Sequence, residues 1–158
     1  MPRIILGIDP GYGRMGFGCL RVANGKTTVL DYGIVSTSAD DAFGDRLVQL
    51  ADDLDELIRT HKPDRLAVEK LYFTKNVKTA MQVAEARGVI MLTAARHKLP
   101  VFEMTPSQAK SALTGNGRAD KKAMQWMVKE ILAMKKGPKL DDAADALALA
   151  ITAAAMRV

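Results

Sequence analysis

Residues 3 to 9 read RIILGID, and Pro10 and Gly11 follow them directly. A short run of β-branched and apolar residues that is closed by turn-forming residues is typical of a strand buried on both faces. The run ends on an acid, Asp9. A carboxylate is costly at such a position unless it has a partner, so this stretch predicts a central strand with a functional group at its end.

Two further strand patterns follow the first one. They lie near residues 15–23 and 27–37, and Asn24-Gly25 separates them. Asn-Gly favours the positive φ angles of a tight hairpin turn. The first three strands are therefore expected to form an antiparallel meander.

A helix and a fourth strand come next. From residue 42 to 61 the apolar residues recur with the spacing of one helix face, and Lys62-Pro63 ends the pattern. Residues 65–69 resume an apolar strand that ends on Glu69. A strand, helix, strand unit of this length pairs its strands in parallel, so we expect Asp9 and Glu69 to meet at one edge of the sheet.

The rest of the chain predicts one more strand and four helices. The strand is expected at residues 100–104, and the helices at 76–97, from Thr105-Pro106 onward, at 119–135 and at 141–156. Alternation of strands and helices favours an α/β fold with a mixed sheet. Trp126 and the nine methionines are expected to pack in the core or in a dimer interface.

Composition excludes several classes of protein. A chain of 158 residues, 48% of them hydrophobic, has the size of one domain, which we expect to span residues 1–158. No apolar run reaches the roughly 18 residues that cross a bilayer, and no signal-like segment opens the chain, so a cytoplasmic location is expected. The single cysteine, Cys19, can form neither an internal disulfide nor a zinc cluster.

Charge is unevenly distributed along the chain, whose formal net charge is +5. Residues 110–139 hold eight basic and two acidic side chains, whereas residues 40–60 hold seven acidic and two basic ones. A charge run is often only a solvated helix face, but a concentrated basic segment also favours a polyanionic partner such as nucleic acid.

Two acids on the last predicted helix complete a candidate site. Asp142 and Asp145 are spaced i, i+3 on an otherwise apolar helix, so they share a face with the residues that pack on the sheet. By spacing alone, Asp141 is as good a ligand as Asp142. Taken singly, Asp9 could be a turn former and Asp142 a helix N-terminal acid, but carboxylates that converge with Glu69 require cations, and oxygen ligands favour Mg²⁺ or Mn²⁺. Such a cluster beside a phosphate-binding surface suits two-metal phosphodiester hydrolysis.

Six short motifs are distributed over nearly the whole chain. They are GIDPG at 7–11, AVEK at 67–70, KNVKTAMQVAEARGV at 75–89, TPSQAK at 105–110, GNGRADK at 115–121 and DDAADALALAIT at 141–152. In this order they closely resemble the RuvC family of bacterial Holliday junction resolvases. The resemblance implies an RNase H-like α/β fold with a five-stranded mixed sheet flanked by helices. It also implies a homodimeric, Mg²⁺-dependent endonuclease that nicks two opposing strands of a four-way DNA junction in recombination and repair, next to the RuvA and RuvB branch-migration proteins.

The same resemblance assigns roles to individual residues. Its four metal-binding acids, which would hold two Mg²⁺ ions with Mn²⁺ as a substitute, fall on Asp9, Glu69, Asp142 and Asp145. An aromatic at the position of Tyr72 contacts DNA bases in the family, where Phe is common. Basic residues at the positions of Lys110 and Lys121 lie near the scissile phosphate. To these we add Arg118, because Gly115 and Gly117 beside it allow the backbone to approach a phosphate closely.

Three alternatives stay open at this point. The turn from Asp9 to Gly13 resembles the first phosphate loop of actin-like and sugar-kinase ATPases, although those bind nucleotide between two such domains. A junction-binding module could keep the acids for folding alone. A nuclease of the same fold could act on a different branched nucleic acid. For a dimer, the helix at residues 76–97, rich in Ala and Met, is the expected interface.

Overall fold

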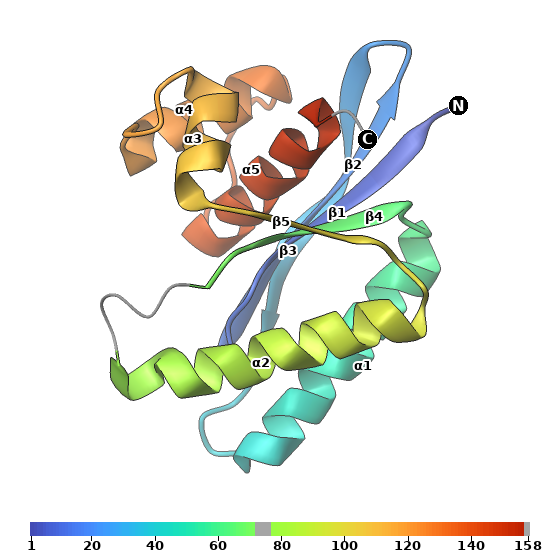
Figure 1. Ribbon diagram of the computed structural model, residues 1–158, viewed down its shortest axis with the longest axis vertical. Coiled ribbons are helices and arrows are strands. Elements are labelled where there is room, and N and C mark those ends of the chain that lie inside the picture. Colours follow the sequence, from blue (N-terminus) through green and yellow to red (C-terminus); the bar gives the residue numbers. More distant parts are fainter. Residues whose placement is uncertain (72–76, 157–158) are drawn as a thin grey trace.

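A computed structural model describes residues 1–71 and 77–156 of the chain. Its centre is a five-stranded sheet in the order β3-β2-β1-β4-β5 (Figure 1). The strands are β1 (Arg3–Asp9), β2 (Arg14–Ala23), β3 (Lys26–Ser36), β4 (Arg65–Glu69) and β5 (Val101–Met104). The α/β class and the mixed five-stranded sheet are as expected.

Pairing within the sheet follows the sequence pattern. The first three strands are antiparallel neighbours, and β1 pairs in parallel with β4, which pairs in parallel with β5. The hairpin between β2 and β3 turns at Asn24 and Gly25, whose φ angles are 52° and 74°. Both the meander and the parallel crossover are therefore confirmed.

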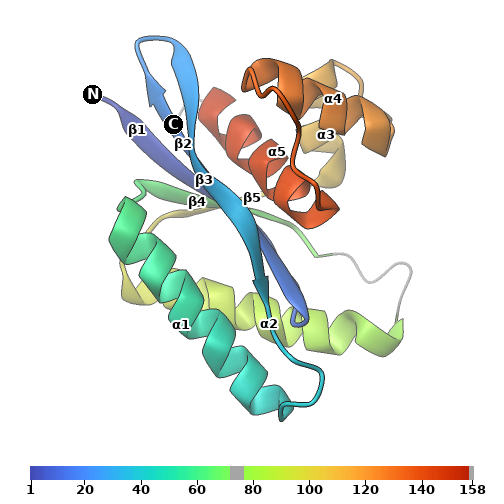
Figure 2. The same ribbon diagram turned by 180° about the vertical axis from the view of Figure 1, so that it is seen from behind.

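Helices cover the two faces of the sheet separately. Figures 1 and 2 show α1 (Phe43–His61) and α2 (Val77–Arg96) on one face, and α3 (Pro106–Thr114), α4 (Lys121–Ile131) and α5 (Asp141–Ala155) on the other. Thr105 caps α3 by accepting a hydrogen bond from the Gln108 amide, with proline at the start of the helix. The helix α4 ends earlier than the spacing predicted, because Ala133 takes a positive φ of 49°.

Each face of the sheet has its own apolar core. Leu6 and Ile8 of β1 pack toward α1 and α2. Ile5 of β1 and Ala67 of β4 pack toward α3, α4 and α5. This alternation along β1 places Gly7 and Asp9 on the same face as Ile5, so the strand presents its terminal acid to the side covered by α5.

The helix α5 lies unusually close to the sheet because glycines form the surface beneath it. A Cβ atom built on Gly7 would lie 2.0 Å from the Ala146 carbonyl oxygen, and one on Gly18 would lie 2.7 Å from Leu147. Only glycine allows this approach of helix backbone to strand backbone. The close packing brings the first turn of α5 to the end of β1.

Candidate active site

Three carboxylates meet where α5 crosses the end of β1. Asp9, Asp142 and Asp145 each offer an oxygen, and these oxygens lie within 4.8 Å of one another. Asp9 closes β1, while the other two side chains come from the first two turns of α5. Residues more than 130 positions apart in the sequence thus form one cluster of oxygen ligands, of the kind that hard divalent cations prefer.

Glu69 lies beside this cluster. It ends β4, and the parallel register pairs Ile8 with Val68, which places Glu69 next to Asp9 at the same edge of the sheet. The side chain also borders a pocket that is shared with Asp145 of α5. The four acids named from the sequence therefore lie at one end of the sheet, with Glu69 beside the tighter group of three.

Burial and mutual repulsion raise the pKa values of three of these acids above their ordinary range. The pKa of Asp9 rises from 3.8 to about 8, because the carboxyl is buried and faces the charges of Asp145 and Asp142. The pKa values of Glu69 and Asp145 are also raised, in both cases mainly by burial. Asp9 therefore holds a proton at neutral pH unless a cation replaces it.

Asp141 occupies a different place from its neighbour. Its carboxylate pairs with the Lys121 ammonium at 2.9 Å and accepts a hydrogen bond from the Gln125 side chain. These contacts lower the pKa of Asp141, led by the hydrogen bond from Lys121. Asp141 is thus turned toward α4, and Asp142 is the one of the two that joins Asp9 and Asp145.

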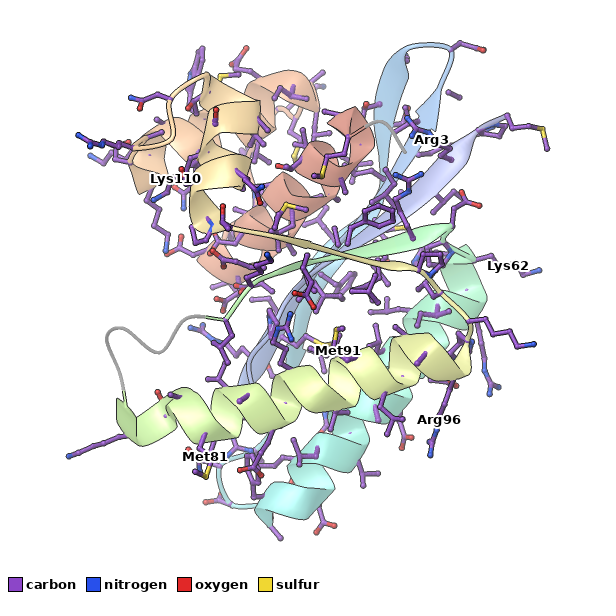
Figure 3. All side chains as sticks on the ribbon, viewed as in Figure 1. Arg3, Lys62, Met81, Met91, Arg96 and Lys110 are labelled. Atoms are coloured by element: carbon purple, nitrogen blue, oxygen red, sulfur yellow. The ribbon has the colours of Figure 1, made fainter. Side chains whose placement is uncertain are left out.

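A pocket with a volume of about 330 Å³ opens next to the acids, between α3, α4 and α5. Its lining includes Glu69 and Asp145 on one side and Lys110 and Lys121 on the other. Lys110 projects from α3 (Figure 3). Carboxylates and ammonium groups around one opening form a surface that can hold cations and phosphate together.

Among the described residues named from the sequence, Arg118 does not line this pocket. Arg118 is exposed, and its backbone amide donates to the Asn116 side chain rather than standing free. Gly117 packs against Ser107, where a Cβ atom would lie 2.7 Å from the hydroxyl oxygen. Tyr72 lies outside the described residues.

Two arginines at the site were not found from the sequence. Arg14, at the start of β2, pairs with Asp142 through an Nε to Oδ2 distance of 3.3 Å. Arg87 of α2 pairs with Glu103 at 3.1 Å and donates to the backbone carbonyl of Glu69 at 3.5 Å. In each pair the arginine and its acidic partner are distant in the sequence, so no sequence spacing predicts the contact. The glycines within strands, Gly7, Gly16 and Gly18, signal a close backbone approach but do not identify either arginine.

Among the described residues, none of the helices is both long and apolar enough to cross a membrane.

Comparison with known proteins now decides the family. The family model described as crossover junction endodeoxyribonuclease RuvC matches residues 5–153. This chain belongs to the RuvC family. The RuvC crossover junction endodeoxyribonuclease of Petrotoga mobilis is 52% identical over 147 residues, which cover 93% of this chain and 90% of that protein. The RuvC of Ruminiclostridium cellulolyticum is 47% identical over 148 residues, covering 94% and 89% of the two chains.

Solved structures agree with this assignment. The RuvC of Thermus thermophilus in complex with a Holliday junction substrate matches with a TM-score of 0.91 at 33% identity, covering 96% of this chain and 93% of that one. The yeast mitochondrial Holliday junction resolvase Ydc2 matches with a TM-score of 0.65 at 14% identity over 94% and 77% of the chains, which shows a shared fold. The expected RuvC family and RNase H-like α/β fold are therefore confirmed.

Proposed function

We propose that this protein is a structure-selective endodeoxyribonuclease that resolves four-way Holliday junctions by paired, symmetric nicks. One observation carries the proposal: the cluster of Asp9, Asp142 and Asp145 opens beside a pocket that also holds lysines, within the fold of the RuvC family. Its relatives are named crossover junction endodeoxyribonucleases. We take residues 1–158 to form a single nuclease domain with this role in recombination and repair.

The acids fit a divalent metal by their chemistry. The pKa of Asp9 is raised to about 8 first by burial of its carboxyl and then by repulsion from Asp145 and Asp142, and a bound proton or cation relieves both costs. Asp9, Asp142 and Asp145 would hold the metal, and Glu69 would complete a set for two Mg²⁺ ions, with Mn²⁺ as a substitute. Bound there, such ions supply the positive charge that activates a water and stabilises the leaving oxygen of a phosphodiester.

The protein's own groups orient the reaction. Asp9 neighbours Glu69 at the sheet edge and belongs to the cluster with the two α5 acids, so it would be a metal ligand in common with both. Lys110 and Lys121 line the same pocket and can bind the nonbridging oxygens of the scissile phosphate. Hydrolysis would form a bond from the water oxygen to phosphorus while the bond from phosphorus to the 3′ oxygen breaks, and the 3′ oxygen takes up a proton. Each nick would then leave a 5′ phosphate and a 3′ hydroxyl, which can be ligated.

Two further DNA contacts belong to the proposal. Tyr72 follows Glu69 by three residues, and an aromatic ring there could stack on an unpaired base next to the cut. Arg118 lies exposed one residue before Ala119, which lines the active pocket, so its guanidinium can bind a phosphate nearby.

Symmetric cleavage calls for two active sites related by a two-fold axis, and we propose that α2 forms the interface of a homodimer. Its outer side carries Met81 and Leu92, which are 71% and 53% exposed. Gly88 lies between them in the sequence, and a Cβ atom built on it would meet open space. Figure 3 shows Met81 on the opposite side of the sheet from Lys110, so a partner on α2 would leave the active pocket open.

The competing hypotheses differ in what they require. An ATPase of the actin type needs a second domain, and failure to bind nucleotide would dismiss it. A binding module without nuclease activity leaves the convergence of three partly buried carboxylates unexplained. We also propose that the protein acts at the same junction as the RuvA and RuvB branch-migration proteins, and in the cytoplasm.

The test is cleavage of a labelled, mobile four-way junction beside a linear duplex of the same sequence, with Mg²⁺, Mn²⁺ or EDTA. We expect paired symmetric nicks in the junction only, lost in EDTA and in the Asp9→Asn variant. Asp52→Asn, an exposed acid of α1, serves as the matched control and should cut like wild type. Junction binding without cleavage under either metal would reject the nuclease and favour the binding module.

A further inference from the structure

An exposed tryptophan lies among lysines on α4, outside the active pocket. Trp126 is the single tryptophan of the chain, and 60% of its surface is exposed although the sequence predicted it to pack in the core or in a dimer interface. Lys122 precedes it by four residues and Lys129 follows it by three, so the three side chains share one stripe of the helix. We call this stripe, with Gly137 and Pro138 facing it, the Trp126 surface.

The Trp126 surface is hollowed. A second pocket lies between α4, the segment before α5 and Ala144 of α5, and it is lined by Lys122, Trp126 and Lys129 together with Gly137 and Pro138. The indole thus forms a wall of a groove that remains open, with a lysine on either side along the helix. An aromatic ring flanked by ammonium groups is a common arrangement for binding a phosphate backbone.

Charge around the groove is almost entirely positive. Residues 121–140 contain six lysines and one acid, Glu130. Among the ion pairs formed by residues 1–71 and 77–156, neither Lys122 nor Lys129 takes part. Asp141, the acid that follows this segment, is already held by Lys121 and Gln125.

The Trp126 groove is a separate opening that lies next to the active pocket along α4. Lys121 lines the active pocket and Lys122, the next residue, lines the Trp126 groove. Asp141 contacts one lining residue of each opening, Lys121 of the active pocket and Gln125 of the Trp126 groove. A DNA strand that crosses α4 from one opening to the other would span the diameter of a helix, about 10 to 12 Å, or about three nucleotides.

We infer that the Trp126 surface binds the backbone of a junction arm at about three or more nucleotides from the cut. Lys122 and Lys129 bind phosphates, and the indole packs against a sugar or base between them. Protein partners are a poorer match, because lysine is depleted at the centres of protein interfaces. The inference rests on the proposed function, since it gives the cut DNA a second contact on the same protomer.

The experiment measures binding of the full-length protein to a four-way junction in EDTA, where no cutting occurs, over a range of salt concentrations. Lys122→Gln combined with Lys129→Gln should weaken binding about tenfold and reduce the salt slope by about one for each lysine that meets a phosphate. The matched control removes two exposed lysines elsewhere, Lys26→Gln with Lys62→Gln. Lys62 precedes β4, at the opposite end of that strand from Glu69 (Figure 3).

A second readout places the contact on the DNA. Methylphosphonate linkages three to six nucleotides from the cut should weaken binding of the wild type but not of the double lysine variant, and linkages far out on the arm should affect neither. The fluorescence emission of Trp126 should change when the protein binds the unmodified junction. It should change less with a junction that carries methylphosphonate linkages three to six nucleotides from the cut. Trp126→Phe lacks tryptophan and serves as the control for background fluorescence.

The outcomes separate this inference from the function on which it depends. Equal affinities and salt slopes for the double lysine variant and its control, with unchanged Trp126 emission, would overturn the inference. If the wild type cuts junctions in Mg²⁺ under those conditions, the nuclease stands and only the second contact is rejected. If the wild type cuts nothing but the methylphosphonate effect appears, the DNA contact stands and the nuclease is rejected.

Discussion

Gly16 of β2 lies directly beneath Asp142 of α5, so closely that a Cβ atom on the glycine would be 2.0 Å from the Asp142 carbonyl oxygen. Gly16 is also the antiparallel partner of Asp9 in the sheet. One glycine therefore sets the height of the first turn of α5 above the end of β1. The separation between the β1 acid and the α5 acids depends on it.

Replacement of Gly16 by alanine should push the start of α5 away from the sheet. We expect a loss of roughly 1 to 3 kcal/mol in the free energy of unfolding, the usual cost of an extra methyl in a packed site. Cleavage should fall further than stability alone explains, because Asp142 moves relative to Asp9. Gly44→Ala, which has open space around it, is the control for both assays. Unchanged cleavage in Gly16→Ala would show that α5 can shift without affecting the acids.

Arg87 should act on catalysis through Glu69. Its guanidinium joins the Glu69 carbonyl of β4 to Glu103 of β5, so it fixes the strand end that carries an acid. Arg87→Met should lower the cleavage rate of bound junction by about 10- to 100-fold, as is usual for groups that orient metal ligands. Junction affinity in EDTA should stay constant, and Arg87→Lys should restore part of the rate.

The control for this position is Arg96→Met, an exposed arginine on the same helix. Single-turnover rates at saturating protein separate chemistry from binding, and a metal titration of each variant gives the concentration of Mg²⁺ for half-maximal rate. A purely structural role would lower the melting temperature of Arg87→Met without changing that concentration.

Asp9 should make the metal-free protein less stable as the pH rises. Its pKa is raised from 3.8 to about 8 in the folded state, so its favourable contribution is complete below about pH 4 and is lost as the pH approaches 8. At pH 8 in EDTA, the free energy of unfolding of Asp9→Asn should therefore exceed that of the wild type by roughly 1 to 3 kcal/mol. At pH 4 the two proteins should differ little. Denaturant titrations at both pH values measure this, and a variant less stable than wild type at pH 8 would contradict it.

The sequence predicted the strands and most of the helices because local signals agree with tertiary structure there. The run from Arg3 to Asp9 is apolar enough to be buried, and Asn24-Gly25 fixes the hairpin. The end of α4 was missed because Ala133, an ordinary helix former, adopts a positive φ that no local pattern announces.

The site was predictable only in part, because some of its contacts join residues that no local sequence pattern connects. Acids at strand ends are visible in a sequence, but the spacing of Asp141 and Asp142 gave no choice between them. That choice follows from contacts with α4, where Lys121 and Gln125 hold Asp141 away from the cluster. Trp126 was expected to pack in the core or in a dimer interface. The core prediction was wrong, because Trp126 is exposed and the face of α4 that packs inward is centred on Val128.

A charge on the outer side of α2 should separate the proposed dimer. Leu92 is 53% exposed, so Leu92→Glu costs the monomer little, whereas a carboxylate buried in a symmetric interface would meet its own copy and lose hydration. We expect the variant to sediment as a monomer at micromolar concentration and to lose paired nicks. Val48→Glu, at an apolar residue of α1 that is 58% exposed, adds the same charge elsewhere and should remain dimeric. If both variants sediment as dimers and cut in pairs, the interface lies on another face of the protein.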